Sequence, residues 1–305
     1  MAGRAGGAGR GRRAGSQGAL REPVRGYDGW MVTDSPLAPL EDACTVVLLR
    51  DGPSGLETLM LERPGKSRTF AGAWVFPGGK VDPADRVDSA GRPLDELGSA
   101  QAAGLRELSE ETGQTLNCGA LVQLSQWTPM QALPRRFRTW FMVARAASDE
   151  VVLNPEEHQR FEWLAPAEAL ARHAQGTMSL VPPTWVTLHG LAGRDSVAQV
   201  LESAGHRAAF SYQTHLLLPG AGTVHGVPDA GAGPGVPGTN GPGRAGNVPD
   251  GMAHTVLPDM MGVRPIGVLW QGDEDYPANG GTPPQPGARH RLTMTGLPWI
   301  FEHNS

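Results

Sequence analysis

Apolar residues gather in short runs through the middle of the chain. Residues 43–49 read Ala-Cys-Thr-Val-Val-Leu-Leu, a nearly continuous apolar run that predicts a strand buried on both faces, and a turn rich in Gly follows at 51–55. Similar runs predict further strands, at 59–63, 73–76, 119–126 and 139–146.

A different, helical spacing of apolar residues follows these runs. It predicts helices at 166–174, where Pro166 falls in the first turn, at 183–192 and at 197–204. Strands that mix irregularly with a few helices indicate an α+β sandwich.

One further helix is predicted around an acidic stretch, Arg-Glu-Leu-Ser-Glu-Glu-Thr-Gly, which runs from Arg106 to Gly113. Gly113 is expected to be the C-cap of this helix. The helix is expected to begin near Gly98-Ser99, with Ser99 as its N-cap.

Three carboxylates of this helix, on Glu107, Glu110 and Glu111, fall at i, i+3 and i+4 and therefore share one face. Neighbouring Cβ atoms on such a face are about 5–6 Å apart, so the charges repel one another. A hard divalent cation would make the arrangement favourable, because carboxylate oxygens are preferred ligands of Mg²⁺ and Mn²⁺. The alternative is a solvated acidic face on which Arg106 pairs with Glu110.

The residues before the acidic helix favour the metal site. Residues 75–79 read Val-Phe-Pro-Gly-Gly, which predicts a strand that enters a Gly-rich turn. The strand, the turn and the acidic helix together resemble the signature of the Nudix hydrolase family. The matching residues are Gly79, Arg106, Glu107, Leu108, Glu110, Glu111 and Gly113.

The resemblance implies both a fold and an activity. The expected fold class is α+β, a Nudix-type α/β/α sandwich with a mixed β-sheet between helices. The expected enzyme is a Nudix-type diphosphatase, a pyrophosphohydrolase that uses Mg²⁺ or Mn²⁺ to cleave a phosphoanhydride bond in a small nucleotide-type substrate. Because Nudix-like ligand sensors and protein-binding modules usually lose box carboxylates, the three retained here favour an enzyme over that non-catalytic alternative.

The resemblance also implies roles for individual residues. The expected metal ligands are Glu107, Glu110 and Glu111, together with the carbonyl of Gly79 or its neighbour. Arg106 is expected to orient a carboxylate through a charge-assisted hydrogen bond. The general base stays open among four glutamates, which are Glu107, Glu110, Glu156 and Glu157.

The chain departs from the family pattern at one carboxylate. The family has a Glu where this chain has Asp85, and the segment from Asp85 to Arg106 is longer than usual. Residues 85–99 are polar and rich in turn residues, which predicts a surface insertion that costs little entropy. Asp85 is expected to be dispensable for turnover.

An insertion at this place resembles one branch of the family, which includes peroxisomal-type coenzyme A diphosphatases. Residues 127–129 (Trp-Thr-Pro) and 134–141 are similar to segments of that branch. The resemblance implies a coenzyme A or acyl-CoA type substrate, whose phosphates Arg63, Arg135 and Arg136 would bind.

Composition narrows the function classes further. The chain has 305 residues, of which 39% are hydrophobic, and a formal net charge of -5, which gives no electrostatic reason to expect a specific nucleic-acid partner. No apolar run approaches the ~20 residues that a membrane helix needs, so no membrane partner is expected. Cys44 and Cys118 are expected to be buried free thiols, which indicates a cytoplasmic protein. A homodimer is compatible with the sequence.

The chain divides into four parts by composition. Residues 1–26 form a Gly/Arg-rich arm that is expected to be disordered, and residues 40–218 form the expected Nudix hydrolase core. Residues 219–289 are expected to form a Gly/Pro-rich flexible segment, and residues 290–305 a segment that docks back on the core. The histidines beyond residue 205 have no metal-ligand spacing and are expected at the surface.

Deleting residues 230–251 should leave the thermal midpoint of the protein nearly unchanged. This stretch consists mostly of Gly, Pro, Ala and Asn, and such a composition cannot bury enough apolar surface to hold a fold. A thermal melt of the deletion variant checks this, and a fall of more than about 4–8 °C would show that the stretch packs on the core.

Overall fold

The computed structural model describes residues 38–53, 55–66, 70–130, 133, 135–220, 264–277 and 284–304. The predicted arm at 1–26 and the stretch 230–251 lie outside these residues.

The helices are α1 (Glu96–Thr112), α2 (Pro166–Ala174), α3 (Pro182–Leu191) and α4 (Val197–Gly205), with short 3-10 helices at Pro83–Arg86 and Cys118–Ala120. The strands of the larger sheet are β1 (Leu40–Gly52), β2 (Gly55–Glu62), β3 (Trp74–Val75), β4 (Gly78–Lys80), β5 (Val122–Thr128), β6 (Arg136–Arg145), β7 (Arg160–Leu164) and β8 (Phe210–Gln213).

The larger sheet is mixed and is organised around β1. Its strand order is β3-β2-β1-β6-β5-β8, while β4 pairs with β1 and β7 pairs with β2. The β1–β6 and β5–β8 pairs are parallel, and the other pairs are antiparallel. Along β1, Val46 and Leu48 face one core cluster and Val47 and Leu49 face the other, which explains the nearly continuous apolar run in the sequence.

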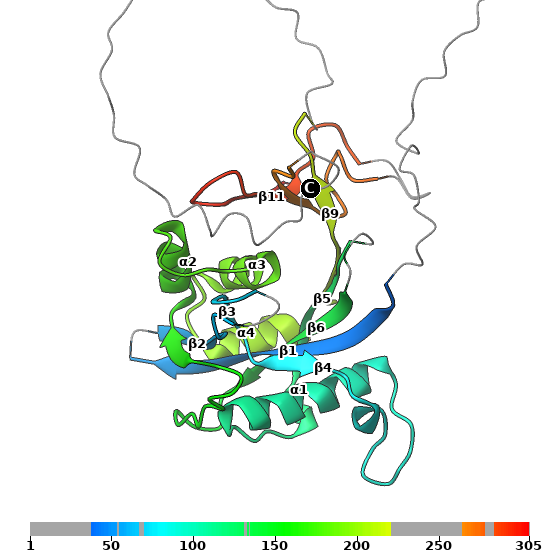
Figure 1. Cartoon of the computed structure of the whole chain (residues 1–305), viewed down its shortest axis with the longest axis vertical. Coiled ribbons are helices and arrows are strands. Elements are labelled where there is room, and N and C mark those ends of the chain that lie inside the picture. Colours follow the sequence, from blue (N-terminus) through cyan, green and yellow to red (C-terminus); the bar gives the residue numbers. More distant parts are fainter. Residues whose placement is uncertain are drawn as a thin grey trace, which may run out of the picture. The chain divides into compact units, whose positions relative to one another are not determined.

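Helices cover both faces of this sheet (Figure 1). α1 packs on one face against β1 and β6, whereas α4 packs on the other face and α2 packs against β2. The predicted α+β fold with a mixed sheet between helices is therefore confirmed. Among the helices that the structure describes, none is both long and apolar enough to cross a membrane.

The helix ends show where local sequence rules held. α2 begins at Pro166 as predicted, and Gly113 ends α1 in the left-handed region at φ 69°, as expected of a C-cap. The predicted start of α1 was wrong. Asp95 is the N-cap, because its Oδ1 accepts a hydrogen bond from the N–H of Gly98 at 2.7 Å, and Ser99 lies buried within the helix.

A smaller antiparallel sheet follows the helices, in the order β12-β11-β10-β9. Its strands are β9 (His215–Leu217), β10 (Gly267–Leu269), β11 (His290–Thr293) and β12 (Ile300–His303). β10 corrects the prediction that all of 219–289 is a flexible segment. The residues Gly-Val-Leu-Trp at 267–270 are buried, so this part of the segment contributes to a core.

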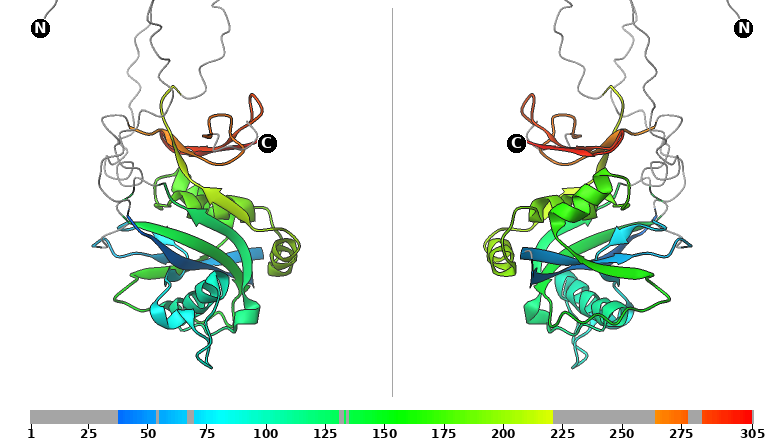
Figure 2. Two further views of the ribbon diagram at one scale, coloured as in Figure 1. Left: turned by 90° about the vertical axis from the view of Figure 1, so that its right-hand side faces the viewer. Right: turned by 90° about the vertical axis from the view of Figure 1, so that its left-hand side faces the viewer.

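The smaller sheet shares the core cluster that α2–α4 cover (Figure 2). Val268, Trp270 and Leu292 belong to that cluster, and the Trp270 Nε1–H donates a hydrogen bond to Thr214 Oγ1 at 3.1 Å. His290 is only 1% exposed, so the expectation that the C-terminal histidines are surface residues is wrong for this one.

Candidate functional site

Two glycines form the floor of the acidic site. Gly78 and Gly79 lie in β4 opposite Thr45 and Cys44 of β1. A Cβ atom at Gly78 would lie 2.2 Å from the Cys44 carbonyl oxygen, and a Cβ at Gly79 would lie 2.2 Å from Glu107 Oε1. Glycine is therefore required at Gly78, where the neighbour is backbone, whereas a side chain at Gly79 would displace the carboxylate of Glu107.

α1 places its carboxylates against these two glycines of β4. Glu111 is 5% exposed, and its Oε2 accepts a hydrogen bond from the Gly78 N–H at 2.8 Å. Glu107 lies beside Gly79, and Glu110 is the most exposed of the three. The predicted shared face of these glutamates is thus turned toward β4.

Arg106 holds the neighbouring carboxylates in place. Its Nη1 donates to Glu107 Oε1 at 2.9 Å and to Glu110 Oε2 at 3.0 Å, and its Nη2 donates to the Lys80 carbonyl at 3.0 Å. These hydrogen bonds fit the predicted orienting role of Arg106. They also include the i, i+4 pair with Glu110 that the solvated-face alternative invoked.

Asp85 is part of this network rather than a loose loop residue. It is 6% exposed, and it accepts hydrogen bonds from Arg106 Nη2 at 2.9 Å and Nε at 3.2 Å and from the Asp82 N–H at 2.9 Å. The bonds to Asp85 raise the pKa of Arg106 further above its usual range. The short side chain of Asp85 reaches Arg106. That Asp85 is dispensable for turnover stays a prediction, and these contacts give a reason to expect the opposite.

Replacing Asp85 by Asn should lower both stability and turnover. The variant removes the carboxylate charge that Arg106 contacts. The free energy of unfolding should fall by about 1–3 kcal/mol, and the thermal midpoint by a few degrees. Turnover should fall more than about threefold, because Arg106 then holds Glu107 less firmly. The matched control is Asp149→Asn, since the Asp149 side chain is 79% exposed. A parent-like thermal midpoint and turnover for Asp85→Asn would restore the original expectation.

Two residues from the loop before β7 complete the acidic site. Ligand atoms of Glu111, Glu157 and His158 all lie within 4.8 Å of one another. The buried His158 places its Nε2 2.7 Å from Glu111 Oε1. Of the two loop glutamates named as candidate bases, Glu157 is the one in this group. Sequence reasoning missed His158, and its position directly after Glu156 and Glu157 was the available signal.

The electrostatics of the site fit a divalent cation. Burial raises the pKa of Glu107 above its usual value, and the charges of Glu111 and Glu110 add to this while Arg106 opposes it. Burial also raises the pKa of Glu157, with a further contribution from the charge of Glu111. Carboxylates that crowd and desolvate one another in this way form a donor set that Mg²⁺ or Mn²⁺ would stabilise.

Replacing Glu107 by Gln should stabilise the metal-free protein at neutral pH. A raised carboxyl pKa means that the contribution of Glu107 to stability is present below its unfolded pKa and is lost as pH rises through its folded pKa. Removing the charge should therefore raise the thermal midpoint by about 2–4 °C at neutral pH, and this gain should vanish near pH 4.

Thermal melts in a chelator at both pH values measure this effect, with Glu202→Gln on the exposed face of α4 as the control. A neutral-pH midpoint for Glu107→Gln below that of the parent would show that the Arg106 contact outweighs the repulsion.

The three arginines predicted to bind substrate phosphates lie in different places. Arg63 lies near the acidic site, since its charge lowers the pKa of Glu157. Arg135 places its Cζ 5.5 Å from the Phe137 ring centre, and Arg136 donates to the Ala38 carbonyl at 3.3 Å. Within the described residues, no contact joins Arg135 or Arg136 to the acidic group.

Other predicted features are placed plainly by the structure. Trp74 and Trp127 are buried in the core. Cys44 is a buried free thiol, as expected, and burial raises its pKa to about 12. Cys44 packs under α1 at Gly104, where a Cβ would lie 2.6 Å from its Sγ. The side chain of Cys118 lies outside the described residues.

Several known proteins are similar to this chain in sequence or in structure. The model of the NUDIX domain matches residues 39–182. A NUDIX hydrolase from Alicyclobacillus acidocaldarius has a similar structure, with a TM-score of 0.50 and 20% identity over 57% of this chain and 100% of that chain. A MutT protein from Methanosarcina mazei Go1 and a MutT NUDIX hydrolase from Burkholderia pseudomallei each show a TM-score of 0.37 and 24% identity over 50% of this chain, covering 92% and 97% of their own chains.

No curated protein matches this chain. The family match covers the larger sheet except β8, together with α1, α2 and the acidic site, and it ends where α3 begins. The NUDIX domain model thus matches residues 39–182, and the chain has the Nudix fold there.

Proposed function

We propose that this protein is a metal-dependent hydrolase that cleaves a pyrophosphate bond in a nucleoside diphosphate-linked substrate. The observation that carries the proposal is that Glu111 of α1 lies with Glu157 and His158, while Glu111 and Glu107 both lie against the Gly78-Gly79 pair of β4. The NUDIX domain supports the same reaction class.

Mg²⁺ or Mn²⁺ would be held by Glu107, Glu110, Glu111 and Glu157, with the Gly79 carbonyl as a backbone ligand. When bound, the cation supplies charge neutralisation of the pyrophosphate and lowers the pKa of a bound water. His158 and the Gly78 N–H hold Glu111 in one orientation from opposite oxygens, which reduces the reorganisation that binding requires.

The general base is proposed to be Glu107 or Glu157. Both have a raised pKa in the absence of a cation, so whichever of the two does not coordinate the cation would accept a proton more readily than an ordinary carboxylate does. Arg106 donates to Glu107 and thereby restricts its orientation, whereas Glu157 is exposed at the site and free of such a bond among the described residues.

A coenzyme A or acyl-CoA type compound is the proposed substrate, with Arg63 placed to bind a phosphate beside the acidic site. Arg135 and Arg136 would act only through a part of the substrate that extends away from the acidic group. The buried reduced thiol of Cys44 supports a cytoplasmic location.

A hydrolysis screen with Mg²⁺ and with Mn²⁺ tests the proposal. The substrates are coenzyme A thioesters, NADH, ADP-ribose, capped nucleotides and nucleoside di- and triphosphates. Metal-dependent turnover of one class is the expected result. Binding of such compounds without turnover under either metal would instead identify a ligand-sensing module.

A further inference from the structure

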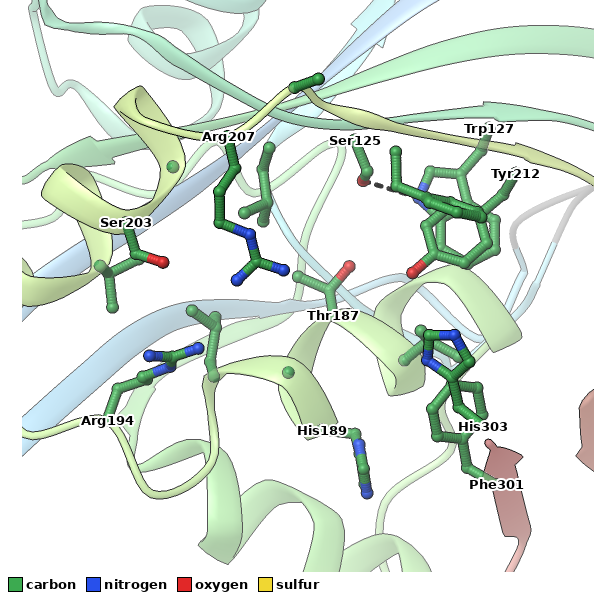
Figure 3. Close-up of a pocket in the computed structure, with 18 of the residues that line it drawn as sticks. Ser125, Trp127, Thr187, His189, Arg194, Ser203, Arg207, Tyr212, Phe301 and His303 are labelled. Carbon is green, nitrogen blue, oxygen red and sulfur yellow. Dashed lines mark hydrogen bonds between the residues drawn. The ribbon is translucent and has the colours of Figure 1, made fainter. Parts of the chain in front are cut away.

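A cavity apart from the acidic site lies on the face of the larger sheet opposite α1, and it is named the second cavity. It has a volume of about 600 Å³ and is bounded by α3, α4, β5, β8 and the β11–β12 pair (Figure 3). Trp127 of β5 belongs to the core cluster on the α2–α4 face, whereas α1 packs against the opposite cluster. The volume falls in the range of about 300–1,000 Å³ that small-molecule sites occupy.

Most of this cavity lies outside the family match. Of the elements that border the cavity, only β5 lies within residues 39–182, and α3 begins at the last of these residues. The remaining walls come from the rest of α3, from α4 and β8 and from the smaller sheet, all of which follow the part of the chain that the NUDIX domain model matches. The cavity is therefore separate from the acidic site in both position and origin.

One end of the cavity is cationic. Arg194 follows α3 and Arg207 follows α4, and both guanidinium groups extend into the cavity near Ser203 (Figure 3). None of the described residues that line the cavity carries a carboxylate. In the part of the chain that the structure describes, neither guanidinium makes an ion pair, although Arg106, Arg138 and Arg291 each pair with at least two acids. Two unpaired guanidinium groups directed into one cavity are suited to a phosphate.

The other end is aromatic. Trp127 and Tyr212 stack with ring centres 3.8 Å apart and an angle of 5° between their planes, and Phe301 and His303 lie at the same end (Figure 3). Phe210 also lines the cavity and is 40% exposed. A flat ligand ring could pack against aromatic faces and edges on several sides of this end of the cavity.

A buried nitrogen provides an independent sign of a missing polar partner. His290 lines the cavity, is 1% exposed, and uses its Nδ1 on the Gln271 carbonyl at 2.8 Å. Its Nε2 is buried and has no hydrogen-bond partner among the residues that the structure describes. Buried polar atoms are rarely left unpaired, and a polar atom on a bound ring would satisfy this nitrogen once the side chains that cover it move aside.

We propose that this cavity binds a nucleotide-type ligand, a molecule in which a phosphate and a flat heteroaromatic ring are joined. The phosphate lies between Arg194 and Arg207, and the ring lies against the aromatic end within reach of His290. This proposal does not depend on the hydrolytic function proposed above, because it involves none of the residues of the acidic site.

The test is a calorimetric titration of the full chain with AMP in the presence of a metal chelator. Arg194→Met and Arg207→Met should each weaken AMP binding at least tenfold, and Arg207→Lys should recover part of that loss. Adenosine and inorganic phosphate should each bind at least tenfold more weakly than AMP, because each occupies only one end.

Two arginine variants serve as matched controls. Arg63→Met removes the arginine beside the acidic site, and Arg92→Met removes an arginine whose side chain is 79% exposed in the insertion. Both should leave AMP affinity unchanged. Arg207 is exposed, so Arg207→Met tests the cavity even where another variant fails to fold.

Three results would overturn the proposal. The first is no AMP binding up to millimolar concentrations. The second is AMP affinity that Arg63→Met lowers and Arg207→Met leaves intact, which would place the ligand at the acidic site. The third is equal affinity for phosphate and AMP, which would show an anion site without ring recognition.

Discussion

Replacing Glu111 by Gln should lower kcat by at least about 10²-fold. The change keeps the size of the side chain but removes a charge from the proposed cation site. The expected fall in kcat is of the size seen when an enzyme loses a key electrostatic stabiliser of its transition state. Glu111 accepts from the Gly78 N–H through Oε2 and contacts His158 through Oε1, so the amide group of Gln would turn its NH₂ toward one of these partners. The effect should therefore exceed that of removing a solvent-exposed charge.

Steady-state turnover at saturating Mg²⁺ or Mn²⁺ measures this effect. Glu202→Gln, on the exposed side of α4, is the matched control and should keep parent-like kcat. Thermal melts of both variants separate loss of chemistry from loss of fold. Near-normal turnover in a folded Glu111→Gln protein would refute the assignment of Glu111 to the cation site.

Replacing Asp273 by Ala should destabilise the protein by about 3 kcal/mol, because the change leaves the buried charge of Arg291 with Asp275 as its remaining ion-pair partner among the described residues. Asp273 is fully buried and Arg291 is 6% exposed. Asp273 accepts from Arg291 Nε at 2.6 Å and from the His290 N–H at 2.9 Å, and its other oxygen accepts from Arg291 Nη2. The pair thus connects β11 to the turn after β10.

The pH dependence of this contribution has a definite sign. Burial alone would raise the pKa of Asp273, but hydrogen bonds from Arg291 and from the His290 and Asp275 N–H groups outweigh it and hold the pKa below its usual value. Stability from Asp273 is therefore present above its unfolded pKa of about 3.9 and is lost as pH falls through the lower folded pKa.

Denaturant unfolding of Asp273→Ala at neutral pH checks this prediction, with Asp149→Asn at the exposed end of an ion pair as the control. A change of less than about 1 kcal/mol would show that the smaller sheet adds little to the stability of the whole. Because β11 and β12 border the second cavity, AMP binding should weaken together with stability in this variant.

The local sequence was sufficient for the parts of this protein that depend on near neighbours. The apolar run at 43–49 predicted a strand buried on both faces, and β1 has that burial because successive side chains alternate between two cores. Pro166 and Gly113 marked a helix start and a helix end, since each restricts or permits one backbone conformation. The spacing of Glu107, Glu110 and Glu111 placed them on one face for the same reason.

Contacts between distant residues were decided only by the tertiary structure. His158 meets Glu111, and Asp85 meets Arg106, across loops whose length carries no information about where their ends come together. The same holds for β10, which pairs with β9 and β11 although a long Gly/Pro-rich stretch separates it from β9. The periodic pattern of a sequence reports which side of an element is buried. It does not report which element covers that side, and both the fourth carboxylate of the acidic site and the second cavity depend on that choice.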